Sequence, residues 1–135
     1  MRGPVIAPGL SAEASQTVTL DRTAAHVGSG SLRVLATPAM ALMIEEVCRK
    51  LVEPLLQAGQ STVGVRLDLR HLAPTPVGMK VRARAEVTAV EAGMITFKAE
   101  VWDEVEKIGE AEHKRAVIDV ERFLQRVEAK AAAGG

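Results

Sequence analysis

Two adjacent glutamates, Glu45 and Glu46, interrupt an otherwise apolar stretch of the sequence. Consecutive helical residues project about 100° apart, so only one of the two can face a buried crevice squarely. A carboxylate in a poorly hydrated cleft can act as a general base or as a nucleophile. The alternative, equally compatible with the sequence, is that both side chains lie at the rim of a helix and are solvated or paired with Arg49 or Lys50.

Thr37 is a second candidate, because it lies eight residues before Glu45. In a helix this spacing corresponds to about 12 Å along the axis and about 80° around it, so one small substrate could touch both side chains. Thr37 also precedes Pro38, and Thr-Pro is typical of a helix start in which Thr is the N-cap. The sequence favours a capping role alone by about two to one.

His71 and Gly64 stand out in one predicted strand. His71 continues the alternating apolar positions Val63, Val65 and on to Leu69, and it precedes a proline-rich turn, near a strand end where clefts form. Histidine is the side chain best suited to transfer protons near pH 7, although on such a face it is more often a satisfied core or edge residue. A glycine inside a strand indicates a bulge or a close backbone approach, and a free Gly64 N–H could stabilise an oxyanion.

Composition excludes several other kinds of chemistry. The 135 residues carry 17 basic and 17 acidic side chains and only 2% aromatic residues, which argues against nucleic-acid binding. Cys48 is the single cysteine, so an intrachain disulfide or a cysteine-based zinc site is impossible, and we expect a buried thiol. His26 and His113 form no recognisable metal spacing with Glu45, so we expect neither metal nor cofactor.

The N-terminus resembles neither a signal peptide nor a membrane span, and we expect a cytoplasmic protein that does not bind membranes.

The hydrophobic pattern predicts one α+β domain over residues 1–135. The predicted elements are an irregular arm at 1–13, a strand at 14–20, a loop at 21–32, a long helix at 39–57 that starts at Thr37-Pro38, strands at 63–70, 81–89, 95–102 and 108–120, and a C-terminal helix and tail at 120–135. Apolar residues lie on most sides of the long helix, which predicts burial all round, and Pro54 should loosen its last turn. Connections after residue 73 are too short for parallel crossovers, so the strands should pair antiparallel.

Several motifs together resemble one known family. These are residues 34–40 (VLATPAM), 42–45 (LMIE) with Cys48, 64–78 (GVRLDLRHLAPTPVG), and 108–109 with 113–118 in the closing strand. Over roughly residues 14–124 the chain resembles the fluoroacetyl-CoA thioesterase-like branch of the hot-dog superfamily. The resemblance implies a hot-dog fold, in which an antiparallel sheet of about five strands wraps a long central helix.

The resemblance also implies an activity and roles for residues. Members of the branch hydrolyse acyl-CoA thioesters and dimerise by joining two sheets edge to edge, with active sites at the dimer interface. Matching by motif gives Thr37, Glu45 and His71 as catalytic residues and Gly64 as the oxyanion donor. Because CoA has an anionic phosphate end, Arg70 and Arg115 are possible contacts of CoA by their charge. We therefore expect an acyl-CoA substrate and a homodimer, possibly a tetramer.

The chain departs from the branch in the loop before Thr37. Residues 27–33 (VGSGSLR) are short and contain no aromatic residue, which disfavours a selective fluoroacyl pocket. Two alternatives remain open. One is a non-catalytic hot-dog protein that binds an acyl-CoA or a related metabolite, and the other is a hydratase or dehydratase on the same fold.

Overall fold

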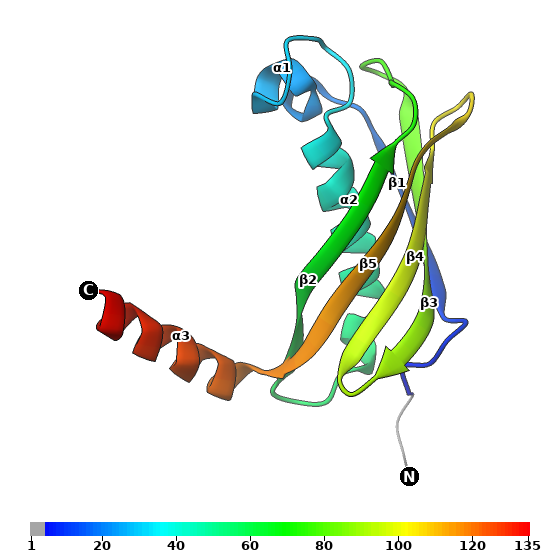
Figure 1. Cartoon of the computed structure of the whole chain (residues 1–135). Coiled ribbons are helices and arrows are strands. Elements are labelled where there is room, and N and C mark those ends of the chain that lie inside the picture. Colours follow the sequence, from blue (N-terminus) through cyan, green and yellow to red (C-terminus); the bar gives the residue numbers. More distant parts are fainter. Residues whose placement is uncertain (1–4) are drawn as a thin grey trace.

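A computed structural model describes residues 5–135 of the chain, and its main feature is a curled sheet that wraps a long helix (Figure 1). The strands are β1 (Ser11–Thr17), β2 (Gln60–His71), β3 (Lys80–Glu91), β4 (Met94–Trp102) and β5 (Lys107–Asp119). The helices are α1 (Ala24–Val27), α2 (Thr37–Val52) and α3 (Val120–Gly134), with short 3-10 turns η1 (Leu20–Arg22) and η2 (Glu53–Leu55).

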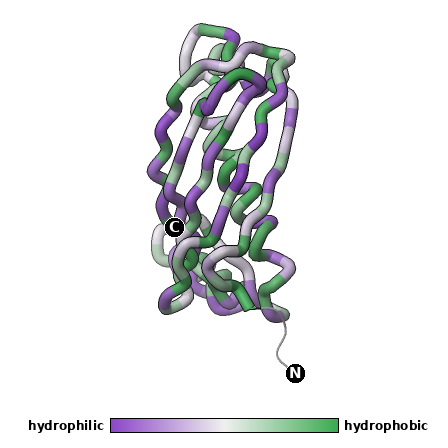
Figure 2. The backbone as a smooth tube through the Cα atoms, turned by 90° about the vertical axis from the view of Figure 1, so that its right-hand side faces the viewer, coloured by the Kyte–Doolittle hydropathy of each residue, from purple (hydrophilic) through white to green (hydrophobic). Residues whose placement is uncertain are grey.

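The five strands form one antiparallel sheet in the order β1-β3-β4-β5-β2. The predicted α+β hot-dog fold is therefore confirmed. Strands β1 and β2 are the two edges, although β2 is twelve residues long. Alternating polar and apolar residues along the strands give the sheet one inner and one outer face (Figure 2).

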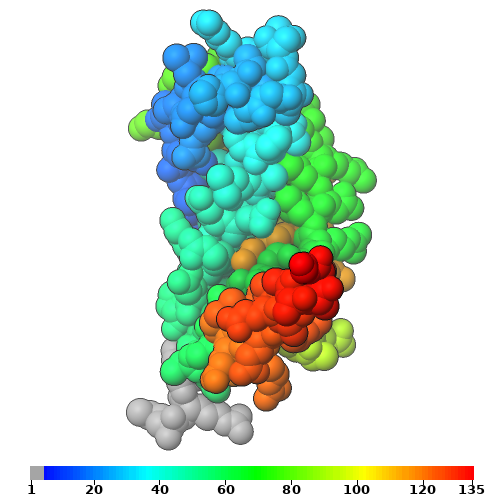
Figure 3. Space-filling view, turned by 90° about the vertical axis from the view of Figure 1, so that its left-hand side faces the viewer, coloured from blue at the N-terminus to red at the C-terminus, as the bar shows by residue number. Residues whose placement is uncertain are grey.

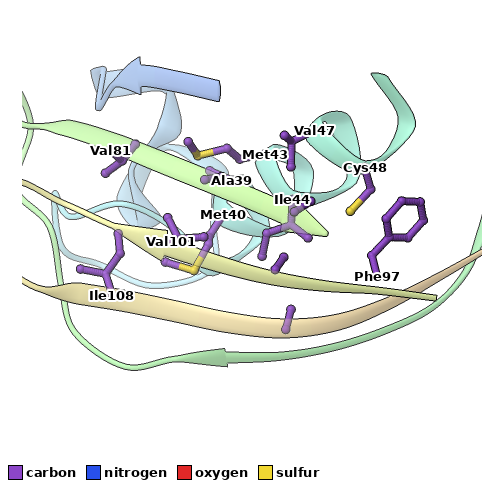
Figure 4. Packing of buried hydrophobic residues seen from close by; sticks show 14 of the residues in the cluster. Ala39, Met40, Met43, Ile44, Val47, Cys48, Val81, Phe97, Val101 and Ile108 are labelled. Atoms are coloured by element: carbon purple, nitrogen blue, oxygen red, sulfur yellow. The ribbon is translucent and has the colours of Figure 1, made fainter. Parts of the chain in front are cut away.

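The core lies between α2 and the inner face of the sheet. Met40, Ile44 and Cys48 recur along one side of α2, with Met40 near Val101 and Cys48 near Phe97, both of β4 (Figure 4). Gly109 on β5 allows the closest approach, because a Cβ at this position would collide with the Met40 sulfur. The helix is thus held at a fixed depth against the sheet, which fixes the positions of the side chains at its rim.

The central helix is shorter and less enclosed than the pattern predicted. It ends at Val52, and Pro54 lies in the following 3-10 turn, as its missing N–H requires. Leu42 is 54% exposed, and Glu45 and Glu46 are half-buried, so the prediction of burial all round is wrong. Figure 3 shows one side of α2, in cyan, at the surface between the N-terminal segments and β2.

The chain ends also differ from the prediction. Residues 1–4 of the predicted arm lie outside the described residues, and β1 begins at Ser11 rather than at 14. Pairing with β3 over the whole of β1 explains the earlier start, since a ladder to another strand is invisible in local sequence. The predicted loop at 21–32 contains η1 and α1. Helix α3 projects away from the sheet and buries none of its residues (Figure 1). Within residues 5–135, no helix is long and apolar enough to cross a membrane.

Candidate active site

Thr37 and His71 meet at the N-terminal end of α2. Thr37 Oγ1 lies 2.7 Å from His71 Nδ1, although the two residues are 34 positions apart. Strand β2 runs antiparallel to α2, so the last residue of the strand comes beside the first residue of the helix (Figure 1). Two of the predicted site residues are therefore brought together by the hot-dog topology.

The capping role predicted for Thr37 is wrong. Ala36 is the N-cap residue, Thr37 is the first helical residue, and Pro38 follows it inside the first turn. No side chain caps this helix, and the Thr37 hydroxyl bonds to His71. The local Thr-Pro signal predicted the helix start correctly but could not reveal a partner supplied by a distant strand.

The imidazole of His71 has one nitrogen free for another group. Nε2 is the buried side-chain polar atom without a hydrogen-bond partner among the residues that the structure describes. Burial lowers the pKa of His71, and the backbone of Ala73 partly opposes this shift. A neutral imidazole with an available nitrogen can accept a proton or bind a polar ligand. His71 and Thr37 line an open hollow together with residues 34 and 72–74.

Gly64 lies at a β-bulge that faces Glu45. The register between β2 and β5 shifts between Gly64 and Arg66, which leaves Val65 as the extra residue. A Cβ built on Gly64 would lie 3.1 Å from Glu45 Oε2, so the carboxylate lies directly against the glycine backbone. The prediction of a bulge or a close backbone approach at this glycine is confirmed.

The bulge also decides which face of β2 carries His71. Residues seven positions apart in a regular strand point to opposite faces, so Gly64 and His71 would not share one. The extra residue, Val65, shifts the alternation of side chains by one position. As a result, Gly64 and His71 both face α2. Val65 itself is 51% exposed, so the continuous apolar face predicted from Val63 to His71 is interrupted.

Two further polar side chains complete the surroundings of Glu45, and the sequence reasoning gave neither of them this place. His113 and Arg115 are adjacent inward-facing residues of β5, only 1% and 5% exposed. Arg115 Nη1 lies 3.8 Å from Glu45 Oε2, and His113 Nε2 lies 3.2 Å from the same nitrogen. The signal was present: strict alternation from Ala111 places residues 113 and 115 on the inner face.

The expected contact of Arg115 with CoA does not fit its position. The guanidinium is buried, and two of its nitrogens bond to Thr62, so it has no open approach for a bulky phosphate group. Arg70 is different: its side chain is 75% exposed, and its nearest acidic group is Glu110 at 3.9 Å. Arg70 therefore remains a candidate for contact with CoA.

The candidate residues form two groups on one chain. One group is Thr37 with His71, and the other is Glu45 with Gly64 and Arg115. Thr37 and Glu45 are eight positions apart in the helix, about 12 Å along the axis. The hollow lined by His71 is not lined by Glu45. A reaction that uses both groups of residues therefore requires an arrangement that brings them closer than they are within one chain.

Cys48 and metal binding add no further chemistry. Burial raises the pKa of the Cys48 thiol to about 12, so the thiol is protonated and inert at neutral pH, as expected for a core residue. Within residues 5–135, no cluster of three or more His, Cys, Asp or Glu side chains is arranged to hold a metal ion.

Comparisons with known proteins identify the family of the chain. Residues 18–121 match the family described as FlK, fluoroacetyl-CoA-specific thioesterase. The chain is 35% identical over 101 residues to the fluoroacetyl-CoA thioesterase of Streptantibioticus cattleyicolor, covering 75% of this chain and 73% of that protein.

Solved structures give the same result. A structure of the fluoroacetyl-CoA thioesterase FlK superposes with a TM-score of 0.87 at 28% identity, covering 94% of this chain and 98% of that one. A thioesterase superfamily member from Thermus thermophilus superposes with a TM-score of 0.85 at 27% identity, covering 98% and 99%. The match of the family over most of the chain and the shared fold lead to one conclusion: the chain belongs to the FlK family of thioesterases and hydrolyses acyl-CoA thioesters.

Proposed function

We propose that the chain hydrolyses a small acyl-CoA with Glu45, Thr37 and His71 as catalytic residues and the Gly64 N–H as oxyanion donor. The contact of the Glu45 carboxylate with the Gly64 backbone carries the proposal. An oxyanion donor and a nucleophile must reach the same carbonyl group from different sides, and this pair provides both within one small space. Thr37 orients His71, which handles the protons.

The chemistry has two routes that this geometry supports equally. In the first, Glu45 removes a proton from water, the water oxygen attacks the thioester carbon, the C–S bond breaks, and the proton passes to the CoA thiolate. In the second, Glu45 attacks the carbon, the C–S bond breaks and CoA leaves as a thiolate. Water then hydrolyses the resulting anhydride to the product carboxylate and free Glu45, and the proton that the water gives up passes to the thiolate. Label found in Glu45 after a single turnover in ¹⁸O-labelled water establishes the second route with attack of water on the Glu45 carbonyl. Trapping of the acyl-enzyme anhydride establishes the second route when water attacks the acyl carbon instead.

The acyl group that we propose is small and is not selected for fluorine. The relative FlK is described as specific for fluoroacetyl-CoA, and a variant of it has been solved with fluoroacetate and CoA. In this chain, the segment before Thr37 has no aromatic residue, and Leu32 in it is 68% exposed. An open segment of this kind supplies no wall for recognising a single fluorine atom. We therefore expect similar kcat/KM for acetyl-CoA and fluoroacetyl-CoA.

We also propose a homodimer formed through the free edges of β2. The long edge of β2 lies beside the uncovered side of α2, where Leu42 is 54% exposed and the Glu45 side chain is 44% exposed. Exposed backbone along a strand edge favours pairing with another strand. A two-fold axis between residues 67 and 68 of β2 would reverse the partner strand and set the partner's His71 opposite Gly64 of the first chain. Such an arrangement would bridge the two groups of site residues.

The exposed Arg70 near the end of β2 is the proposed contact for the anionic part of CoA. We propose the cytoplasm as the compartment, on the ground of the single free thiol of Cys48. The non-catalytic alternative receives no support from the relatives, which are described as thioesterases.

The direct test is hydrolysis of a panel of acyl-CoA thioesters with increasing chain length by the purified protein. We expect turnover of short acyl groups and a loss of about 1000-fold in kcat for Glu45→Gln. Glu46→Gln, one position along the helix, is the matched control and should retain activity. If Glu45→Gln hydrolyses every active thioester within a few fold of the wild type, the assignment of Glu45 is wrong.

Sedimentation at micromolar concentration should give the mass of a dimer.

A further inference from the structure

A buried polar group on the inner face of the sheet is not explained by packing. Thr62, His113 and Arg115 are 6%, 1% and 5% exposed and lie among apolar side chains. Burying an arginine is costly unless its charge and its donors are satisfied. Their arrangement therefore calls for a physical reason.

The guanidinium of Arg115 is held by three hydrogen bonds in a fixed orientation. Nε donates to Thr62 Oγ1 at 2.9 Å, Nη2 donates to the Thr62 carbonyl at 3.1 Å, and Nη1 donates to His113 Nε2 at 3.2 Å. The same Nη1 also lies 3.8 Å from Glu45 Oε2, within ion-pair distance. Thr62 and His113 thus determine where the positive charge lies relative to the carboxylate.

The hydrogen bonds of His113 also determine its tautomer. Arginine can only donate, so Nε2 of His113 must be the acceptor, and Nδ1 must carry the hydrogen that it donates to the Arg66 carbonyl at 2.8 Å. Burial lowers the pKa of His113, and the backbone bond to Arg66 partly opposes this, while Arg115 adds to the lowering. His113 is therefore neutral and connects Arg115 to the backbone of β2.

The Arg66 carbonyl belongs to the bulge that presents Gly64. The register shift lies between Gly64 and Arg66, so a bond to this carbonyl holds the bulge directly. A Cβ on Gly64 would lie 3.1 Å from Glu45 Oε2, 3.3 Å from His113 Cε1 and 3.4 Å from Arg115 Nη1. All of these groups converge on one point.

We propose that His113 and Thr62 are positioning residues of the thioesterase site. His113 links the bulge to Arg115, and Thr62 fixes the other side of the guanidinium, so that Glu45 and the Gly64 amide keep the separation that the reaction needs. This inference rests on the proposed role of Glu45. Neither residue touches the substrate, and their effect is exerted through Arg115 and the bulge.

Thr62→Val is the main test, because valine has the shape of threonine and lacks the hydroxyl. We expect kcat to fall about tenfold while KM stays within about threefold, since a misplaced catalytic group affects the reaction more than binding. Thr62→Ser should restore kcat, because the hydroxyl returns. Thermal unfolding shows whether each variant is folded.

His113 is tested with a graded pair. His113→Gln offers an acceptor to Arg115, and we expect it to retain more kcat than His113→Leu, which removes both bonds and should lose about 10- to 100-fold. Glu112→Gln, on the outer face next to His113, is the control and should leave kcat unchanged, since its ion pair with Arg66 is exposed.

Two outcomes separate this inference from the proposed function. If Glu45→Gln is inactive while folded Thr62→Val and His113→Leu keep wild-type kcat, the positioning role is wrong and the role of Glu45 stands. If Glu45→Gln is fully active, the proposed function is wrong. In the Glu45→Gln background, Thr62→Val should cause no further loss, because its effect passes through Glu45.

Discussion

The two groups of site residues are built in opposite ways. Thr37 and His71 share one hydrogen bond in an open hollow, and His71 Nε2 has no partner among the described side chains. Glu45 lies against Gly64 and a guanidinium that is held by three bonds within the chain. The first group has an unpartnered nitrogen, and the second lies against a guanidinium that the chain holds rigidly.

This difference indicates how the work is divided. A group that must transfer protons to and from water or a leaving thiolate needs a nitrogen without another partner, which His71 Nε2 provides. A group that must meet a carbonyl carbon at a fixed position needs a fixed partner, which Arg115 provides for Glu45 at 3.8 Å. Changes near Glu45 should therefore affect kcat most, and changes elsewhere in the core should affect stability alone.

The largest effect on activity after Glu45→Gln should come from His71. We expect His71→Ala to lower kcat by about 100-fold, because proton transfer then relies on water. His26→Ala is the matched control, since His26 is exposed on α1 and should leave kcat unchanged. Steady-state kinetics with the best short acyl-CoA measures both. Equal kcat for His71→Ala and the wild type would remove the first group from the mechanism.

Gly64→Ala tests the rigid group directly. The added Cβ would lie 3.1 Å from the Glu45 carboxylate and 3.4 Å from Arg115, so the carboxylate must shift. We expect kcat to fall about 10-fold or more while the protein stays folded. Kinetics together with thermal unfolding checks this. Unchanged kcat would show that the contact of Glu45 with the bulge has no role in catalysis.

Gly109→Ala gives the opposite result at a second close approach of helix and sheet. Its Cβ would collide with the Met40 sulfur in the core, away from Glu45. We expect a loss of about 1–3 kcal/mol in the free energy of unfolding, from overpacking, and kcat within a few fold of the wild type. Urea unfolding measures the first quantity. A large loss of kcat in a stable Gly109→Ala protein would contradict the separation of the two regions.

The smallest effect concerns pH and stability. Burial lowers the pKa of His71 and of His113 below the ordinary value of 6.5. In the pH range between each lowered pKa and 6.5, the unfolded chain therefore binds more protons than the folded chain. The free energy of unfolding should be greatest above pH 6.5 and decrease as the pH falls below it. Urea midpoints at several pH values measure the decrease, which His113→Gln should reduce. A stability that rises toward acid pH would contradict neutral buried imidazoles.

The fold could be predicted from sequence because its signals are local. The Thr37-Pro38 pair marks the start of α2, and alternating residues mark four of the strands. The start of β1 at Ser11 could not be predicted in this way, because it depends on pairing with β3. Pairing between distant segments leaves no trace in the residues of one segment alone.

The site was only partly predictable for the same reason. Gly64 inside an alternating strand indicated the bulge. The partner of Thr37 was missed because His71 comes from a strand 34 residues away. Arg115 was assigned to CoA on the basis of its charge, although its alternation with Ala111 and His113 already placed it inside. Residue type suggests which side chains could do chemistry, and position in the sheet decides which of them lie together.

The central claim is that the two groups meet across a dimer, and mixing two inactive chains tests it most directly. His71→Ala keeps Glu45, and Glu45→Gln keeps His71. In a heterodimer of these chains, sites shared between subunits contain one complete set. Random mixing in equal amounts forms heterodimers in about half of the molecules, so the claim predicts about a quarter of wild-type activity. Activity no higher than that of the separate variants, with heterodimers demonstrated, would contradict it.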